Sequence, residues 1–233
     1  MIYSPAYSHL TLTSSPRYPT LRNVALIPDG NRRWARRENV SLDQAYDAVA
    51  QTLRRISAAI FQHNVESLSV YILSKDNLDR DPTELIYTFR SHIRILRNVL
   101  PELAIQWQAH VFHIGDDSIL PTDYKDALND VRLFSEQTSG LRRIYLYAGY
   151  SVGWELSYIL ELQSQKVGIH QNVPGDIDLL IRSGGEKRLS GFCPIQVQYA
   201  EFFFLEKLFP DIETEDIEQV IQEYYSRNRR FGK

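Results

Sequence analysis

A single carboxylate among arginines marks the first stretch that could carry out chemistry. Asp29 and Gly30 follow an apolar run at 24–27 that is typical of a buried strand, and a helix-compatible segment comes next. Such a strand–turn–helix junction leaves backbone N–H groups free to bind an anion. The nearby basic side chains are Arg32, Arg33, Arg36 and Arg37. Because arginines alone would bind phosphate, the acid among them predicts a Mg²⁺ ion that bridges Asp29 to a diphosphate. A solvated turn before a basic helix is the simpler alternative.

A second loop of the same kind lies near the C-terminus. The segment at 176–181, which contains Ile177, Leu179, Leu180 and Ile181, predicts a buried strand, which leads into Arg182, a glycine pair at 184–185, Arg188 and Ser190. Guanidinium groups match phosphate bidentately, and glycines let the backbone approach a ligand closely. Two loops of this composition predict two anion sites.

Together with three further blocks, these loops resemble the cis-prenyltransferases, the undecaprenyl diphosphate synthase family. The resemblance runs from about Asn23 to the C-terminus, in the family's order. One block alone is weak evidence, whereas five in order are specific. The matching blocks are Asp29-Gly-Asn-x-Arg33-Trp-Ala, Ser74-x-x-Asn77-x-x-Arg80, Arg182-x-Gly-Gly-Glu-x-Arg188-x-Ser190, Tyr199-Ala-Glu201 and Arg229-Arg-Phe-Gly232.

The candidate site residues are the matched residues, for which the resemblance implies roles, together with neighbouring residues such as Arg32 and Tyr46. The catalytic candidates are Asp29, Asn31, Ser74, Asn77 and Tyr46. The substrate-binding candidates are Gly30, Arg32, Arg33, Trp34, Arg36, Arg80, Arg182, Arg188 and Ser190. Asp29 and Glu201 are the expected ligands of Mg²⁺. The group that accepts the final proton stays open between the Ser74–Asn77 pair, Tyr46 and a released diphosphate oxygen. As an exposed loop acid, Asp29 is expected to be essential for turnover and dispensable for folding.

The chain departs from the family's usual pattern where the allylic donor is expected to bind. The departures resemble the irregular branch of the family, the lavandulyl and cyclolavandulyl diphosphate synthases. That resemblance implies head-to-middle condensation of two allylic diphosphates, which gives a branched or cyclised product. The departures are Arg32 in place of a glycine, Leu42 in place of an arginine, Ala45-Tyr46-Asp-Ala-Val49 in place of Gly-His-x-x-Gly, Leu78 in place of a tryptophan, and Gly149-Tyr-Ser151 in place of Asn-Tyr-Gly.

Three other functions stay open at this point. The chain could be a regular short-chain cis-prenyltransferase that adds isopentenyl diphosphate. It could also be a terpene-cyclase-like enzyme that ionises one longer diphosphate on the same fold. A non-catalytic partner subunit is the third alternative, and the presence of Asp29, Arg182, Arg188 and Glu201 argues against it.

Apolar spacing predicts the elements that must position these loops. Strands alternate with helices, which predicts an α/β domain with a mostly parallel central sheet flanked by helices. The resemblance adds an apolar tunnel between sheet and helices, and assembly as a homodimer. The expected strands are 24–27, 67–73, 105–115, 143–148 and 176–181, and the expected helices are 45–60, 82–96, 121–137, 154–165 and 217–224.

Composition sets the remaining limits. The chain has 233 residues, 43% of them hydrophobic, which suits one catalytic domain at 23–233 after a loose N-terminal extension at 1–22. A net charge of −3 gives no reason to expect a nucleic-acid partner. One cysteine excludes an internal disulfide framework and fits a reducing compartment. No apolar run approaches the roughly 18 residues of a membrane span, so we expect a cytoplasmic protein without integral membrane association.

Overall fold

The computed structural model describes residues 20–165 and 174–227. Within them six strands form one sheet in the order β3-β4-β2-β1-β5-β6, and every neighbouring pair is parallel. The predicted parallel sheet is therefore confirmed. The strands are β1 (Asn23–Ile27), β2 (Ser67–Ser74), β3 (Ala109–Ile114), β4 (Arg142–Tyr150), β5 (Leu179–Arg182) and β6 (Glu201–Phe204).

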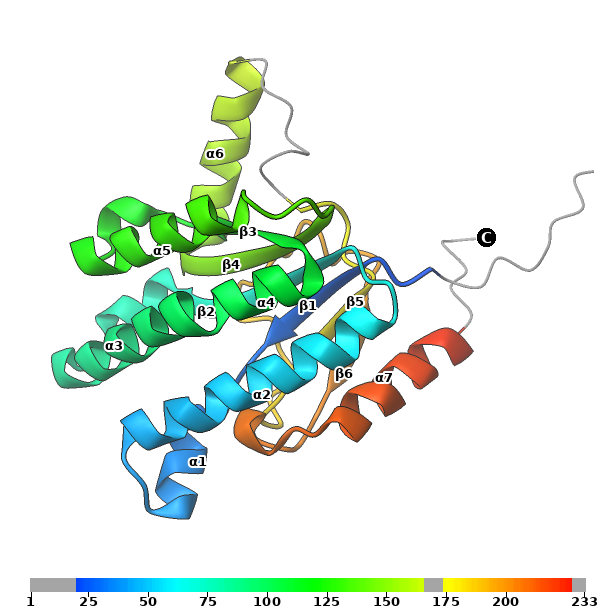
Figure 1. Cartoon of the computed structure of the whole chain (residues 1–233), viewed down its shortest axis with the longest axis horizontal. Helices are drawn as coiled ribbons and strands as arrows, with labels where there is room; N and C mark the ends of the chain where they lie inside the picture. Colours follow the sequence, from blue (N-terminus) through cyan, green and yellow to red (C-terminus); the bar gives the residue numbers. More distant parts are fainter. Residues whose placement is uncertain (1–19, 166–173, 228–233) are drawn as a thin grey trace, which may run out of the picture.

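Helices cover the sheet, as Figure 1 shows. The buried core on one face includes residues from α2, α3, α4, α5 and α7, whereas α6 projects away from them at the top of Figure 1. The helices are α1 (Asn31–Glu38), α2 (Leu42–Gln62), α3 (Pro82–Asn98), α4 (Leu100–Trp107), α5 (Thr122–Ser135), α6 (Val152–Ser164) and α7 (Thr214–Ser226). No helix of the described residues is long and apolar enough to cross a membrane.

Local sequence explains most of the boundaries. Ser41 caps α2 through a capping box with Gln44, and Asp81 caps α3 ahead of Pro82. The expected strand at 105–115 starts too early. Pro101 lies in the first turn of α4, which continues to Trp107 and ends at Gln108 in a left-handed conformation, so β3 begins only at Ala109.

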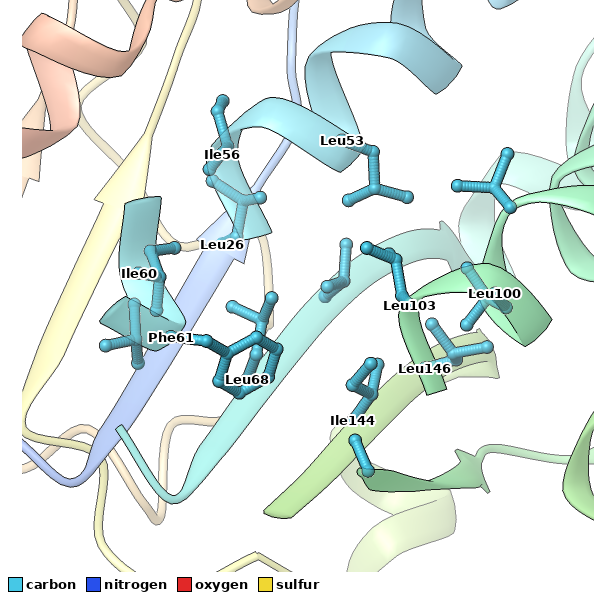
Figure 2. Close-up of a cluster of buried hydrophobic side chains, with 14 of the residues drawn as sticks. Leu26, Leu53, Ile56, Ile60, Phe61, Leu68, Leu100, Leu103, Ile144 and Leu146 are labelled. Atoms are coloured by element: carbon cyan, nitrogen blue, oxygen red, sulfur yellow. The ribbon is translucent and has the colours of Figure 1, made fainter. Parts of the chain in front are cut away.

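The larger core lies between the helices and one face of the sheet. Figure 2 shows strand residues facing side chains from α2 and α4. A smaller apolar cluster on the opposite face includes Phe192, Cys193 and Val197, which belong to the irregular segment before β6. Because the central strands are covered on both faces, their sequences are almost continuously apolar. The labelled core residues are Leu26, Leu53, Ile56, Ile60, Phe61, Leu68, Leu100, Leu103, Ile144 and Leu146.

The parallel sheet brings the candidate loops to one edge. β1 lies between β2 and β5, and the loops that carry Asp29, Ser74 and Arg188 all begin at or just after the carboxyl ends of these strands. Most of the predicted N-terminal extension, residues 1–19, lies outside the described residues. Leu21 is already buried in the core, so the packed chain begins slightly before residue 23.

Candidate active site

Asp29 and Arg182 join the two arginine-rich loops into one site. Ile27 pairs with Arg182 in the sheet, so the loop after β1 lies beside the loop after β5. Arg182 Nη2 donates to Asp29 Oδ2 at 2.8 Å, and its Nη1 donates to Ser190 Oγ at 3.0 Å and to the Arg188 carbonyl. Arg182 is 4% exposed, so its guanidinium is fixed in the wall between the loops. The two predicted anion sites are adjacent parts of one site.

Ser183 and Gly184 fix the backbone of Asp29. Ser183 Oγ accepts a hydrogen bond from the Asp29 N–H at 2.9 Å and donates to the Asp29 carbonyl at 2.9 Å. Gly184 has a φ of +85°, and a Cβ there would lie 3.2 Å from the Asp29 carbonyl carbon and 2.6 Å from Arg33 Nη2. Glycine is therefore required. The sequence analysis missed Ser183, although it directly follows a candidate arginine.

The N-terminus of α1 lies beside Asp29 at the same site. Gly30 is the N-cap residue with a φ of +102° and provides no side-chain cap, so the first N–H groups of the helix stay available to an anion. Arg33 Nη2 lies 3.4 Å from Asp29 Oδ1. Asn31 donates through Nδ2 to the Pro28 carbonyl at 3.2 Å, and its buried Oδ1 has no partner among the described residues.

Ser74, Asn77 and Arg80 border the opening from the β2 side. Ser74 Oγ accepts from the Asn77 N–H at 3.1 Å and so caps the short 3₁₀ turn Lys75–Asp79. Glu84 links two arginines: its Oε2 accepts from Arg32 at 2.9 Å and its Oε1 lies 3.4 Å from Arg80. The sequence analysis missed Glu84, although it lies four residues after Arg80 on a predicted helix.

These residues surround a cavity of about 550 Å³ that passes between the sheet and the helices. Its opening is charged, and its lining also includes the apolar side chains of Val49, Leu53, Leu96, Leu100 and Leu146. Thirteen candidates from the sequence analysis line it: Asp29, Gly30, Asn31, Arg32, Arg33, Arg36, Tyr46, Ser74, Asn77, Arg80, Arg182, Arg188 and Ser190.

Trp34 does not line the cavity. Its Nε1 donates to Asp211 Oδ1 at 2.8 Å, and Arg37 donates to both oxygens of the same carboxylate at 2.7 Å. The hydrogen bond from Arg37 also lowers the pKa of Asp211. Trp34 therefore attaches α1 to the turn Phe209–Asp211 outside the cavity, and this contact helps to hold the first loop in place.

Glu201 also lies apart from the gathered residues. It begins β6 opposite Leu179, whereas Arg182 pairs with Phe204 at the far end of the strand. Three strand residues correspond to about 10 Å. Glu201 Oε2 accepts from Arg227 Nη1 at 2.6 Å. Within one chain, Asp29 and Glu201 are therefore too far apart to bind the same ion.

Two polar residues of α3 were missed by the sequence analysis. Thr88 Oγ1 accepts from the Tyr46 hydroxyl at 3.3 Å, and His92 Nδ1 lies 3.2 Å from the Tyr124 hydroxyl. Thr88, His92 and Tyr46 line the cavity. Burial raises the pKa of Tyr46, so its phenol stays protonated at neutral pH and is a hydrogen-bond donor instead of a base. The four-residue spacing of Glu84, Thr88 and His92 is the signal that could have revealed them.

Comparison with known proteins identifies the family to which this chain belongs. The sequence profile of the family described as "Putative undecaprenyl diphosphate synthase" matches residues 27–232. This chain belongs to the undecaprenyl diphosphate synthase family. The enzyme is accordingly a prenyltransferase.

The activities named for individual relatives are consistent with this family. The chain is 31% identical over 238 residues to a tritrans,polycis-undecaprenyl-diphosphate synthase (geranylgeranyl-diphosphate specific) of Pyrobaculum aerophilum, covering 95% of this chain and 99% of the relative. It is 31% identical to an isoprenyl transferase of Treponema denticola, covering 91% of this chain and 97% of the relative.

Solved structures give the same fold. Lavandulyl diphosphate synthase from Lavandula x intermedia, in complex with dimethylallyl diphosphate, matches with a TM-score of 0.82 and 27% identity, over 92% of this chain and 99% of that structure. A probable undecaprenyl diphosphate synthase from Campylobacter jejuni matches with a TM-score of 0.76 and 26% identity, over 91% and 99%.

The departures from the family pattern are only partly gathered at the cavity of this prenyltransferase. Arg32, Tyr46 and Val49 line it. Leu42 lines a neighbouring groove, and Ser151 caps α6 by accepting from the Trp154 N–H at 3.3 Å. The expectation that all these changes surround the donor pocket therefore holds for Arg32, Tyr46 and Val49 and fails for Leu42 and Ser151.

The donor groups of the site fit a magnesium ion held with substrate. Asp29 Oδ2 accepts a hydrogen bond from Arg182, whereas among the described residues Oδ1 has only the long 3.4 Å contact with Arg33. The described residues contain no group of three or more His, Cys, Asp or Glu side chains that could enclose a metal. Mg²⁺ usually takes one or two carboxylates and completes its shell with phosphate and water oxygens, so Asp29 with a bound diphosphate suits it.

Proposed function

We propose that this enzyme joins two allylic diphosphates head to middle and releases a branched, lavandulyl-type product, open or cyclised. Membership of the prenyltransferase family supports diphosphate chemistry in general. The finer proposal is supported by the likeness to the solved lavandulyl diphosphate synthase and by Arg32 and Tyr46 in the cavity wall.

The observation that carries the proposal of short substrates is the size of the cavity. An apolar cavity of about 150 Å³ holds benzene, which corresponds to about 25 Å³ per non-hydrogen atom. On that scale a cavity of about 550 Å³ holds about 22 such atoms. Two five-carbon diphosphates contain about 28, with their charged oxygens at the open mouth, whereas an undecaprenyl chain alone contains about 55 carbons. The cavity suits short substrates.

In the proposed reaction, charged groups at the mouth stabilise the diphosphate that leaves. Arg33 and the first N–H groups of α1 neutralise its developing charge. Mg²⁺ bound to Asp29 and the diphosphate would supply the remaining Lewis-acid neutralisation. The apolar walls exclude water from the allylic cation.

The second prenyl diphosphate is proposed to bind at the loop after β5. Arg182, Arg188 and Ser190 would hold its diphosphate and present its internal double bond to the cation. Burial raises the pKa of Tyr46 and keeps its phenol protonated at neutral pH, so we propose that the proton passes to the Ser74–Asn77 pair or to the released diphosphate.

The family resemblance also leads us to propose a cytoplasmic homodimer. β6 is an edge strand that pairs only with β5 among the described residues, and an open edge favours association. Leu156 and Leu160, one turn apart on α6, are 48% and 65% exposed. The resemblance also implies that the C-terminal tail with its arginines at 229 and 230 reaches the partner's active site, but these residues lie outside the described ones.

Regular elongation with isopentenyl diphosphate is the second candidate. It is favoured by the names of the curated relatives from Pyrobaculum aerophilum and Treponema denticola. The non-catalytic subunit is not retained, because the family and its relatives are transferases. Nothing in the described site favours a cyclase that acts on one longer diphosphate.

A product assay separates these functions. The purified enzyme with Mg²⁺ receives dimethylallyl diphosphate alone, then with isopentenyl diphosphate, and then geranyl or farnesyl diphosphate alone. We expect product from dimethylallyl diphosphate alone, and dephosphorylation should release a branched or cyclised ten-carbon alcohol. A linear cis product that forms only with isopentenyl diphosphate would establish regular elongation. Conversion of a single longer diphosphate to a cyclic product would establish the cyclase.

A further inference from the structure

One wall of the cavity changes character with depth. Glu84, Thr88, His92 and Leu96 lie four residues apart on α3, and Thr88, His92 and Leu96 all line the cavity. Each step of four residues advances about 6 Å along a helix. Glu84 joins the arginines at the mouth, so the wall passes from charged groups to a hydroxyl, then to an imidazole, and only then to hydrocarbon.

Tyr46 on α2 completes a polar band with Thr88 and His92. The Tyr46 hydroxyl donates to Thr88 Oγ1 at 3.3 Å, and the Tyr46 ring meets the His92 ring edge-on with centroids 5.6 Å apart. Thr88 and His92 are both buried, at 3% and 7% exposure. The polar band therefore places polar atoms in the part of the cavity where the hydrocarbon chain of a prenyl substrate is expected to lie.

The orientation of His92 decides what it offers to the cavity. Its Nδ1 lies 3.2 Å from the hydroxyl of the fully buried Tyr124, for which no other hydrogen-bond partner exists among the described residues. A buried phenol must donate its proton, so Tyr124 donates to Nδ1 and the ring proton sits on Nε2. Nε2 has no hydrogen-bond partner in the described chain, so this cavity-lining residue keeps an unpaired N–H donor.

We propose that the polar band of Tyr46, Thr88 and His92 limits the donor to a five-carbon allylic diphosphate. The inference rests on the proposed binding of the donor diphosphate at the Asp29 mouth. One isoprene unit is about as long as a helical turn, so a five-carbon chain whose diphosphate binds at the mouth beside Glu84 would end near Thr88. A longer chain must pass His92 to reach Leu96 and Leu100, which strips water from Nε2–H without replacing its hydrogen bond.

The selectivity of the enzyme for donors of different chain length tests the proposed role of the polar band. The enzyme is given dimethylallyl, geranyl or farnesyl diphosphate as donor, with whichever acceptor supports turnover, and kcat/KM is determined for each. We expect wild-type kcat/KM to fall at least tenfold from the five-carbon to the ten-carbon donor. Thr88→Val, which keeps the shape, and the pair His92→Leu/Tyr124→Phe, which removes both hydrogen-bond partners together, should each narrow that gap roughly tenfold.

Ser91→Ala is the matched control. Ser91 is buried on the same helix, and it does not line the cavity, so its replacement should leave the donor ratio unchanged. Thermal unfolding confirms that each variant is folded. Wild-type enzyme that uses farnesyl as well as dimethylallyl diphosphate overturns the proposal, as does an unchanged ratio in folded Thr88→Val. Because the ratio can be measured with isopentenyl diphosphate as acceptor, failure of irregular condensation does not affect this test.

Discussion

At the scale of single residues, Asp29 has two tasks where its sequence context indicates one. Its position in a polar turn predicts an exposed acid for metal and diphosphate. Its carboxylate also neutralises Arg182, whose side chain is only 5% exposed, and that contact depends on the pairing of β1 with β5. The arginine-rich composition of both loops could be read from the sequence. Their contact could not, because 153 residues separate the partners.

Replacing Asp29 therefore affects both stability and turnover. Asp29→Ala leaves Arg182 buried without its counter-charge, which should cost about 3 kcal/mol of the free energy of unfolding. Asp29→Asn keeps one hydrogen-bond acceptor for Arg182 and should cost less. Both variants should lose at least a hundredfold in kcat, because neither supplies the carboxylate that holds Mg²⁺. Urea unfolding and steady-state kinetics at saturating Mg²⁺ measure the two effects. Near-normal turnover in Asp29→Asn would remove the carboxylate from the mechanism.

At the scale of elements, the sequence pattern indicated β1 to β5 and most of the helices, and β6 was not among the expected strands. Runs such as 24–27 and 176–181 indicated the strands whose carboxyl ends meet at the site. The α4–β3 boundary was misplaced, because Ile105 to Trp107 continue an apolar pattern that fits strand or helix equally well. The polar band was missed for a different reason: two helices must be packed before Tyr46 is seen to face Thr88 and His92.

The contact of α3 with α5 gives a pH-dependent stability. Burial, followed by the nearby charge of Arg80, lowers the pKa of His92 to about 4 from 6.5. Between these values the unfolded chain binds a proton that the folded chain excludes, so stability must fall as the pH falls. The loss approaches about 3 kcal/mol at pH 4.

Urea unfolding at pH 7, 5.5 and 4.5 checks this loss against His92→Leu/Tyr124→Phe. The variant should lose less stability over the same range. His113, whose pKa is also lowered by burial, is present in both proteins and cancels in the comparison. Parallel pH profiles would show that His92 is protonated in the folded protein.

At the scale of the whole molecule, the position of Glu201 in a single chain does not explain the metal-binding role that was expected for it. The resemblance assigned it to metal, yet it sits at the amino-terminal edge of the sheet and pairs with Arg227. Sequence motifs carry no information about which end of a strand a residue occupies until the register is known. A second copy of the chain is the remaining route by which this edge could serve an active site.

The exposed face of α6 supplies a test of that assembly. Leu156 and Leu160 form an apolar strip on a helix that stands away from the other helices (Figure 1), and such strips usually mark interfaces. We expect light scattering to give twice the 27.1 kDa chain mass for the wild type. Leu156→Asp/Leu160→Asp should shift it to one chain mass, because burying two charges in an apolar contact is unfavourable. Leu133→Asp on α5, where the leucine is 46% exposed, is the matched control and should remain dimeric. A double variant that keeps the dimer mass would place the interface elsewhere, and a wild-type monomer would exclude the homodimer.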